Sequence, residues 1–302
     1  MAPLVLMGET AEIDTETASS PDANGVDLWH ARISLAIADT VDRIDLFFGD
    51  DRLDDENPRT RLNTSVGLKY DGDEGPSLAT DFKLRLALPQ LDNRLQVFVD
   101  NAFTADEPQE IDSLSDAANE SEPDTGLRYI FKRDKTRLIN ADIGNRFSSP
   151  AQIFSRLQGR KIIPCQEWEL RLKQTVSWFF DDGWTENSEM TWNRPMEGRY
   201  LFRSTSRLAW EEKSRGATPS QAFILFKELN ARSGYSFTLS GTWPETPHVE
   251  SANYSTILTY RRLIYKQWLS LEISPGMEFP QSEDYELNPF ITIQCGILFS
   301  DE

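Results

Sequence analysis

The stretch Trp-Glu-Leu-Arg-Leu-Lys-Gln-Thr-Val-Ser-Trp-Phe-Phe, residues 168–180, decides the fold because apolar and polar residues alternate along most of it. Successive side chains of a β-strand point to opposite faces, so the alternation predicts a strand with one apolar and one polar face. The apolar face carries Trp168, Leu170, Leu172, Val176, Trp178 and Phe180, and the other face carries Glu169, Arg171, Lys173, Thr175 and Ser177. Such a strand separates two very different environments.

The same alternation recurs from residue 59 to the C-terminus. It is clearest in 61–70 and 78–88, and further candidate strands cover 94–101, 125–132, 137–147, 151–160, 184–194, 199–211, 219–229, 233–243, 253–263, 267–279 and 287–299. We therefore predict about fourteen strands joined by turns such as Asp71-Gly72-Asp73. The patterns in 151–160 and 219–229 are faint, so the count falls to twelve if those two segments are not strands.

Residues 28–49 follow a different period. The apolar residues Ile33, Ile37, Val41, Ile44 and Phe48 recur three or four positions apart, which predicts an amphipathic helix that ends at Gly49. The acidic residues 1–27 show no apolar period and are predicted to be disordered, and residues 50–58 to be an acidic linker. The first eight residues are either the remnant of an export signal or an ordinary disordered start.

The composition excludes some function classes. The 302 residues carry a formal charge of −18, which argues against nucleic-acid binding because phosphate recognition needs a surplus of Lys and Arg. No apolar run approaches the roughly 18 to 20 residues that a membrane-spanning helix needs. A mean hydropathy of −0.50 is typical of soluble proteins, yet it is also the average expected of alternating lipid-facing and charged registers.

The aromatic residues are placed at strand ends. Trp168 and Trp178 share one face ten residues apart, as do Tyr200 and Trp210. At about 3.3 Å per residue and a tilt of roughly 40°, ten residues span about 25 Å along a barrel axis, the height of an outer-membrane apolar band between its aromatic girdles. The full predicted girdle set is Tyr70, Trp168, Trp178, Trp184, Trp192, Tyr200, Trp210, Tyr235, Trp243 and Tyr254.

The connections between the predicted strands alternate in length. Every second one is short, at 89–93, 133–136, 194–198, 230–233 and 263–266. Several of the others are long and acidic, at 101–124, 211–219, 244–252 and 280–287. Short turns at one end and longer loops at the other are typical of bacterial outer-membrane barrels, and an even strand number puts both chain ends on the short-turn side.

Residues 59–302 therefore resemble a bacterial outer-membrane β-barrel, porin-like in general pattern. The resemblance implies an all-β fold: a closed antiparallel transmembrane β-barrel in the outer membrane of a Gram-negative bacterium, in contact with outer-membrane lipid and with both termini in the periplasm. Barrels of this class usually end on an aromatic residue, whereas Ser300-Asp301-Glu302 follow Phe299 here. The alternative is a soluble all-β sandwich, and the two folds differ in that the sandwich would dissolve in buffer without detergent.

Catalysis, metal binding and cofactor chemistry find little support in the residues. The two histidines, His30 and His248, are predicted to lie on opposite sides of the membrane, so they do not share a site. His248 has Ser251 nearby, but a lone histidine in a loop is usually solvated. Acidic residues gather in 106–124, but they lack the ligand spacing of a calcium loop. We expect neither a disulfide bond nor another functional role for Cys165 and Cys295. We expect no enzymatic activity, no cofactor and no metal site.

The inward face of the predicted barrel remains as the candidate functional site. Its basic residues are predicted to be Arg61, Lys69, Lys83, Arg85, Arg94, Arg128, Lys132, Arg171, Lys173, Arg203, Arg207 and Arg261, with Asp81, Glu167, Glu169, Glu189, Glu228 and Glu272 among them. One interpretation is that ion pairs fill the barrel and make it rigid. The other is that surplus Arg and Lys line a water-filled path and favour anionic solutes.

The predicted helix bears on that choice. Its apolar face suits a charged wall badly, so we expect it beneath the barrel, on the leaflet surface or docked on a periplasmic partner rather than inside the lumen. The sequence thus predicts a narrow channel for small, preferentially anionic solutes. The alternative is a non-conducting structural or partner-binding barrel whose N-terminal helix docks a periplasmic or membrane protein.

Overall fold

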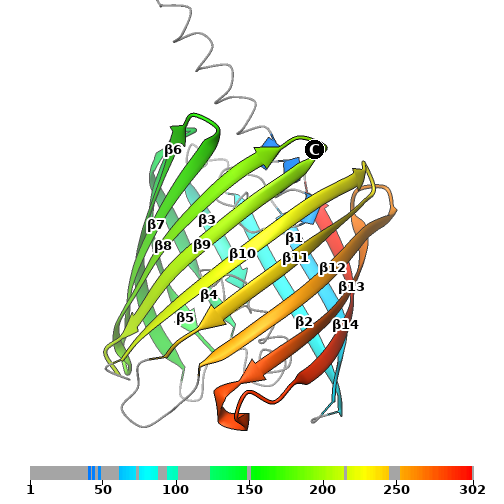
Figure 1. The fold of residues 1–302 in the computed structure, drawn as a ribbon. Coiled ribbons are helices and arrows are strands. Elements are labelled where there is room, and N and C mark those ends of the chain that lie inside the picture. Colours follow the sequence, from blue (N-terminus) through cyan, green and yellow to red (C-terminus); the bar gives the residue numbers. More distant parts are fainter. Residues whose placement is uncertain are drawn as a thin grey trace, which may run out of the picture.

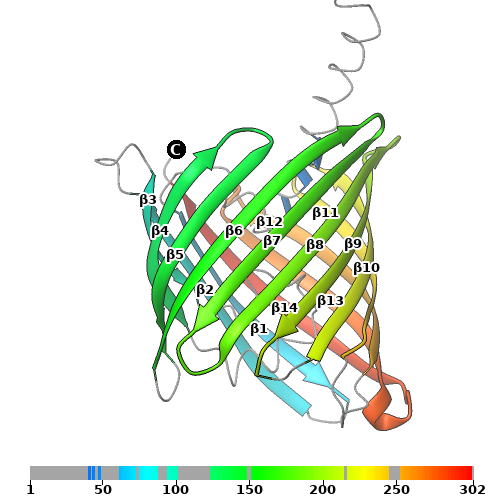
Figure 2. The same cartoon turned by 90° about the vertical axis from the view of Figure 1, so that its left-hand side faces the viewer.

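Fourteen antiparallel strands form a closed barrel (Figures 1 and 2). Each strand pairs with the next along the chain, and β1 (Arg61–Asp71) also pairs with β14 (Asn288–Ser300), which closes the ring. The strands between them are β2 (Gly75–Ala87), β3 (Leu95–Asp100), β4 (Asp124–Arg133), β5 (Arg137–Arg146), β6 (Gln152–Cys165), β7 (Trp168–Phe179), β8 (Gly183–Met196), β9 (Tyr200–Glu211), β10 (Gly216–Asn230), β11 (Ser233–Thr242), β12 (Asn253–Tyr265) and β13 (Leu269–Pro280). A short 3-10 helix, η3 (Gln281–Glu283), precedes β14.

The structure is a computed structural model. It describes residues 40–41, 43–44, 47–48, 61–72, 75–87, 94–100, 123–147, 151–213, 216–244 and 252–300. Among these residues, no helix has the length and hydropathy needed to cross a bilayer.

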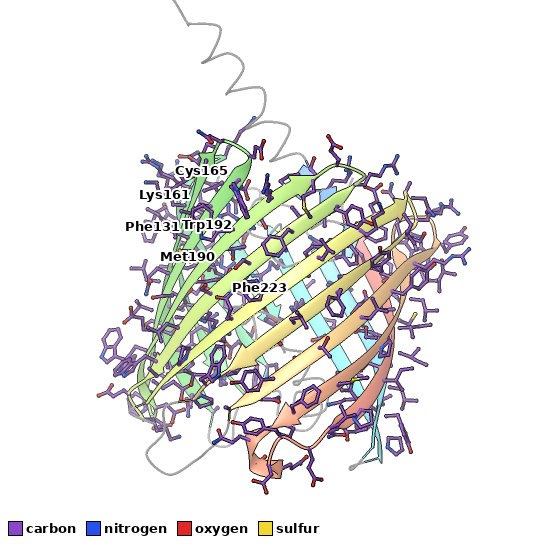
Figure 3. All side chains as sticks on the ribbon, viewed as in Figure 1. Phe131, Lys161, Cys165, Met190, Trp192 and Phe223 are labelled. Atoms are coloured by element: carbon purple, nitrogen blue, oxygen red, sulfur yellow. The ribbon has the colours of Figure 1, made fainter. Side chains whose placement is uncertain are left out.

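The predicted closed antiparallel barrel of fourteen strands is confirmed, and both faint segments are strands. In β6 the alternation is blurred because Phe154 points inward and is fully buried, while Lys161 points outward (Figure 3). In β10 the run Ile224-Leu225-Phe226 is apolar on both faces. Both strands pair along most of their length with a neighbour on each side, so each forms although its alternation is weak.

The two ends of the barrel differ in their connections. We call the end that holds the β4–β5, β6–β7, β8–β9, β10–β11 and β12–β13 turns the short-turn end, and the other the loop end. The β8–β9 turn is tight because Gly198 and Arg199 both adopt positive φ, at 76° and 64°. At the loop end, 101–123 connects β3 to β4 and 243–252 connects β11 to β12. β1 starts and β14 finishes at the short-turn end, where Arg61 pairs with Ser300.

The barrel is polar inside and apolar outside. Buried polar or charged side chains outnumber buried apolar ones by thirty to twelve among the described residues. The outer wall instead exposes large apolar side chains, such as Phe131 at 56% and Phe223 at 45% (Figure 3). A soluble sandwich buries its apolar faces, so this distribution excludes the sandwich and fits a wall that faces lipid.

Candidate functional site

Strand alternation directs most of the predicted basic residues into the barrel. The ten that take inward positions are Arg61, Lys69, Lys83, Arg85, Arg128, Arg171, Lys173, Arg203, Arg207 and Arg261. Arg128, Arg171 and Arg203 are at most 4% exposed, although they line an interior that a fourteen-strand barrel makes wide. The interior beside these residues is therefore filled rather than open.

Lys132 differs from the prediction. The register of β4 against β5 shifts between Ile130 and Lys132, so Lys132 lies opposite the outward-facing Ile139, and Arg133 lies opposite the buried Leu138. A β-bulge inserts one extra residue and exchanges the faces of all residues beyond it. Lys132 consequently points outward, 45% exposed and 3.6 Å from Asp134.

Arg94 also differs. It lies just before β3 rather than within it, and it is exposed. Its carbonyl oxygen accepts a hydrogen bond from the backbone nitrogen of Ile130 at 2.8 Å, so its backbone belongs to the barrel rim. Glu167, another residue expected inside, lies in the β6–β7 turn and pairs with Arg194 at 2.6 Å.

Ion pairs bridge the inner wall from β4 to β6. Arg128 binds Asp142 through two hydrogen bonds of 2.8 and 2.9 Å, a bidentate geometry that favours the charged pair. Asp124 accepts hydrogen bonds from Arg146 at 2.9 Å and Arg156 at 3.1 Å. The sequence predicts Asp124 in the long acidic connection 101–124, but it is the first residue of β4 and is 6% exposed.

An aromatic cluster inside the barrel supports these arginines. Phe98, Phe154 and Phe179 point inward from β3, β6 and β7, and each is at most 5% exposed. The Arg146 guanidinium lies 4.3 Å from the centre of the Phe179 ring, a cation–π distance. None of the three is among the residues predicted to line the interior, because each interrupts a polar register. That interruption is the signal in the sequence that marks them.

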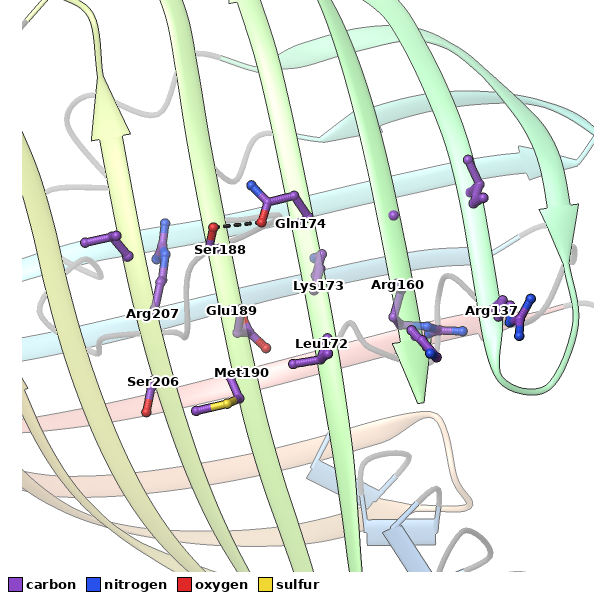
Figure 4. Close-up of a pocket in the computed structure, with 14 residues that line it drawn as sticks. Arg137, Arg160, Leu172, Lys173, Gln174, Ser188, Glu189, Met190, Ser206 and Arg207 are labelled. Carbon is purple, nitrogen blue, oxygen red and sulfur yellow. Dashed lines mark hydrogen bonds between the residues drawn. The ribbon is translucent and has the colours of Figure 1, made fainter. Parts of the chain in front are cut away.

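One row of charges crosses four neighbouring strands. The register aligns Arg160 of β6, Lys173 of β7, Glu189 of β8 and Arg207 of β9 (Figure 4). Three of the four are basic. Arg207 Nε donates to the Asn187 side-chain oxygen at 3.0 Å, which orients its guanidinium. Lys173, Glu189 and Arg207 are only partly buried, whereas Arg171 and Arg203, nearer the short-turn end, are almost fully buried.

The wall from β11 to β13 carries many hydroxyl groups beside the Arg261–Glu272 pair. The hydroxyl oxygens of Ser240 and Ser255 are hydrogen-bonded at 2.5 Å, and the Ser274 hydroxyl donates to the Thr259 hydroxyl at 3.0 Å. The interior is therefore asymmetric, because most of its basic side chains come from strands between β1 and β9.

Six described residues of the segment predicted to be the N-terminal helix lie inside the short-turn end. The described residues Thr40, Val41, Arg43, Ile44, Phe47 and Phe48 are helical, and the rest of 28–49, with Ile33 and Ile37, lies outside the described residues. Val41 and Ile44 are at most 1% exposed and pack against the inward-facing Leu201 and Phe226. This differs from the expectation that the helix avoids the lumen, because the wall at this height is apolar.

Two polar contacts hold the same segment. Arg43 Nε lies 3.2 Å from a carboxylate oxygen of Glu228, and Arg261 Nη1 donates to the Phe48 carbonyl oxygen at 2.6 Å. Arg261 also donates to Glu272 at 2.7 Å. The segment thus occupies the interior at the end where β9, β10, β11 and β12 meet their short turns.

The predicted girdle aromatics all take outward positions. Trp168, Trp192, Tyr200 and Tyr235 lie towards the short-turn end, and Tyr70, Trp178, Trp184, Trp210, Trp243 and Tyr254 towards the loop end. Neighbouring members touch: the Trp168 and Trp192 rings are 6.2 Å apart, and Trp243 Nε1 donates to the Tyr254 hydroxyl at 3.0 Å. Trp268, which is absent from the predicted girdle set, stacks on Phe299 at the short-turn end.

Reactive groups are sparse in the described part of the chain. No cluster of three or more His, Cys, Asp and Glu residues that suits a metal ion occurs there. Cys165 and Cys295 are both free thiols, and Cys165 is the last residue of β6 rather than part of a turn. His30 and His248 lie outside the described residues.

The closed barrel and its two faces have the fold of a porin-like bacterial outer-membrane β-barrel, which supports a location in a bacterial outer membrane. Among solved structures, OprB of Pseudomonas putida at high pH matches with a TM-score of 0.52 and 9% identity, over 83% of this chain and 97% of that one. CdiB from Acinetobacter baumannii matches with a TM-score of 0.50 and 8% identity, over 80% of this chain and 60% of that one. OmpT of Vibrio cholerae matches at 0.48 and 10% identity, over 80% and 97%. No protein-family model and no curated protein matches the sequence.

Proposed function

We propose that this barrel is a narrow channel for small solutes and that it favours anions. The observation that carries the proposal is the row Arg160, Lys173, Glu189 and Arg207, which places three basic groups and one acidic group across four adjacent strands of the inner wall. Rings of Arg or Lys lower the energy barrier for an anion that enters a pore, because their positive charge compensates for the hydration that the anion loses.

The burial pattern supports a narrow path. Fourteen strands enclose more space than side chains of the wall alone can fill. Val41 and Ile44 nevertheless occupy part of the short-turn end, and Asn193 and Thr205 nearby are at most 1% exposed. The solute path therefore runs beside or past the N-terminal segment.

We propose that the protein, as a channel-type barrel, lets its solute pass without catalysing a reaction. We also propose that the short-turn end faces the periplasm, as in bacterial barrels with short periplasmic turns, which puts both chain ends on that side. The alternative, a non-conducting barrel whose helix docks a partner, loses support because Val41 and Ile44 are buried against the barrel's own wall. Absence of current would restore that alternative.

The reversal potential in a salt gradient across a planar bilayer tests the preference for anions. The double substitution Lys173→Gln and Arg207→Gln removes two charges of the row, and it should shift the permeability ratio from anion preference towards unity. Lys132→Gln is the matched control, because that lysine faces outward and its loss should leave the ratio unchanged. A cation preference in the unmodified protein, or an equal shift in both variants, would contradict the proposal.

A further inference from the structure

The outer wall has a hollow at the row of charges described above: Arg160, Lys173, Glu189 and Arg207 are four of its fourteen lining residues. It encloses about 830 Å³ over β5 to β9, and ten of its fourteen lining residues take outward positions (Figure 4). Gly159 lies within it, and a Cβ atom there would meet nothing within 4 Å. Leu172, Met190 and Leu208 line it with apolar surface. The hollow therefore opens towards the lipid and is mostly apolar.

Two basic side chains border the hollow at the short-turn end. Arg137 and Lys161 lie directly opposite each other in the β5–β6 register, and both are exposed (Figure 3 shows Lys161 pointing away from the barrel). Like charges placed opposite each other on neighbouring strands repel, which destabilises the pair unless an anion lies between them. Neither side chain has an ion-pair partner within the described residues.

The depth of this pair matches the headgroup region of a bilayer. Lys161 lies four residues before Cys165, the end of β6, and Arg137 is the first residue of β5. The hollow extends from there towards the middle of the wall, where Ser188 donates to Gln174 at 2.7 Å and Gln174 donates to Glu186 at 2.8 Å. These hydrogen bonds engage the Ser188 hydroxyl and one N–H of the Gln174 amide on the outer face, and the apolar surface at Gly159, Leu172 and Met190 is the part of the hollow that suits an acyl chain.

We propose that this hollow binds an anionic phospholipid of the leaflet at the short-turn end. The lipid phosphate lies between Arg137 and Lys161, whose guanidinium and ammonium groups both suit a phosphate oxygen, and one acyl chain fills the hollow over Gly159. A second copy of the chain is a poorer fit, because a like-charged pair would then meet protein rather than an anion. The site depends only on the barrel lying in a membrane, and not on conduction.

Native mass spectrometry of the full-length protein in detergent, with equal amounts of phosphatidylglycerol and phosphatidylethanolamine, tests the site. We expect retention of one phosphatidylglycerol. The double substitution Arg137→Gln and Lys161→Gln should weaken that retention roughly thirtyfold, since each basic group near a bilayer surface contributes about 1 kcal/mol to binding anionic lipid. The matched control, Arg262→Gln with Lys266→Gln, removes two exposed charges from the same end seven strands away and should leave it unchanged.

Two further arms separate the lipid from other occupants. Gly159→Leu fills the hollow without changing a charge, and it should also reduce retention; its open surroundings mean that the barrel still folds. Inorganic phosphate should fail to displace the lipid, because it lacks the acyl chain. Equal retention of the two lipids, an equal loss in the control, displacement by phosphate, or a two-protein mass that Gly159→Leu abolishes would each overturn the proposal.

Discussion

At the scale of single residues, Lys132 and Arg133 show how one backbone irregularity exchanges the faces of a strand. Strict alternation along 125–132 predicts Lys132 inside, but the bulge after Ile130 turns it outward and puts Arg133 in its place. A bulge depends on the match between two strands, so one strand's sequence cannot locate it. The ten inward basic residues lie in strands whose register runs without a shift at their positions, which is why alternation placed them.

The first prediction compares substitutions on the outer and inner faces of β14. Ile293 is 45% exposed on the outer wall near the middle of the strand, and Gln294 beside it points inward and donates to Ser65 at 2.6 Å. Ile293→Arg should lower the free energy of unfolding in lipid vesicles by about 2–4 kcal/mol, because it puts a charge in the apolar band. Gln294→Arg introduces the same residue into the polar interior and should cost less than half as much. Equal losses in denaturant titrations would contradict the assigned faces.

The second prediction concerns the buried ion pair between Arg128 and Asp142. Asp142→Asn removes the carboxylate from a bidentate contact in which both side chains are at most 5% exposed, so the unfolding free energy should fall by about 3 kcal/mol. Glu167→Gln is the control, since its pair with Arg194 is exposed at the rim and should be worth less than about 1 kcal/mol. A loss of the same size in both variants would show that the inner-wall pair is not desolvated.

At the scale of elements, the N-terminal segment is where the sequence was least informative. The apolar period of 28–49 predicts a face that needs covering, and the described helical residues have such a face. The covering surface comes from Leu201, Ile224 and Phe226, apolar residues in an otherwise polar inward register. Those exceptions are visible in the sequence, but only the closed barrel shows that they lie together.

The third prediction concerns the seating of this segment. Ile44→Asp puts a charge into an apolar contact that leaves Ile44 only 1% exposed, so the segment should leave the barrel interior. Trypsin cleavage after Arg43, followed by mass spectrometry, should then be faster than in the unmodified protein. Arg43→Lys keeps both the cleavage site and a cation near Glu228, and should be cut at the unmodified rate. An unchanged rate in Ile44→Asp would mean that the segment is not held by this contact.

The fourth prediction concerns a tie between two connections at the loop end. Lys213 donates a hydrogen bond to Asp182, and this contact lowers the pKa of the Asp182 carboxyl below its usual value, with a smaller effect from Gln152. The same contact raises the pKa of Lys213. A depressed carboxyl pKa stabilises the folded state above the unfolded value of about 3.9, and the effect is lost as pH falls through the folded pKa. For the raised lysine, the effect is present below its unfolded pKa and lost as pH rises through the folded one.

A carboxyl-carbon NMR titration of Asp182 in micelles checks this tie. The midpoint should lie below the usual aspartate value in the unmodified protein and should rise when Lys213→Gln removes the ammonium group. If the midpoint stays the same in that variant, Lys213 is not the cause of the shift.

At the scale of the whole molecule, the sequence predicts the fold, but it does not predict whether the lumen is open. Alternation, girdle spacing and alternating connection lengths are local properties repeated over fourteen strands, so errors at Lys132 or Arg94 do not change the architecture. Whether the interior is open depends on contacts between distant segments, such as Val41 with Phe226. The charge of −18 likewise conceals a basic stretch of inner wall, since acidic residues concentrate in 9–27, 50–56 and 106–124.

The fifth prediction tests the central claim that this barrel is a narrow channel with its own N-terminal segment in the short-turn end. Single-channel conductance of the purified protein in a planar bilayer is the most direct measurement. The full chain should give small discrete current steps, and removal of residues 1–57 should give larger steps, because the space occupied by Val41, Ile44 and Phe48 is then free for ions. No current with or without those residues would contradict the account.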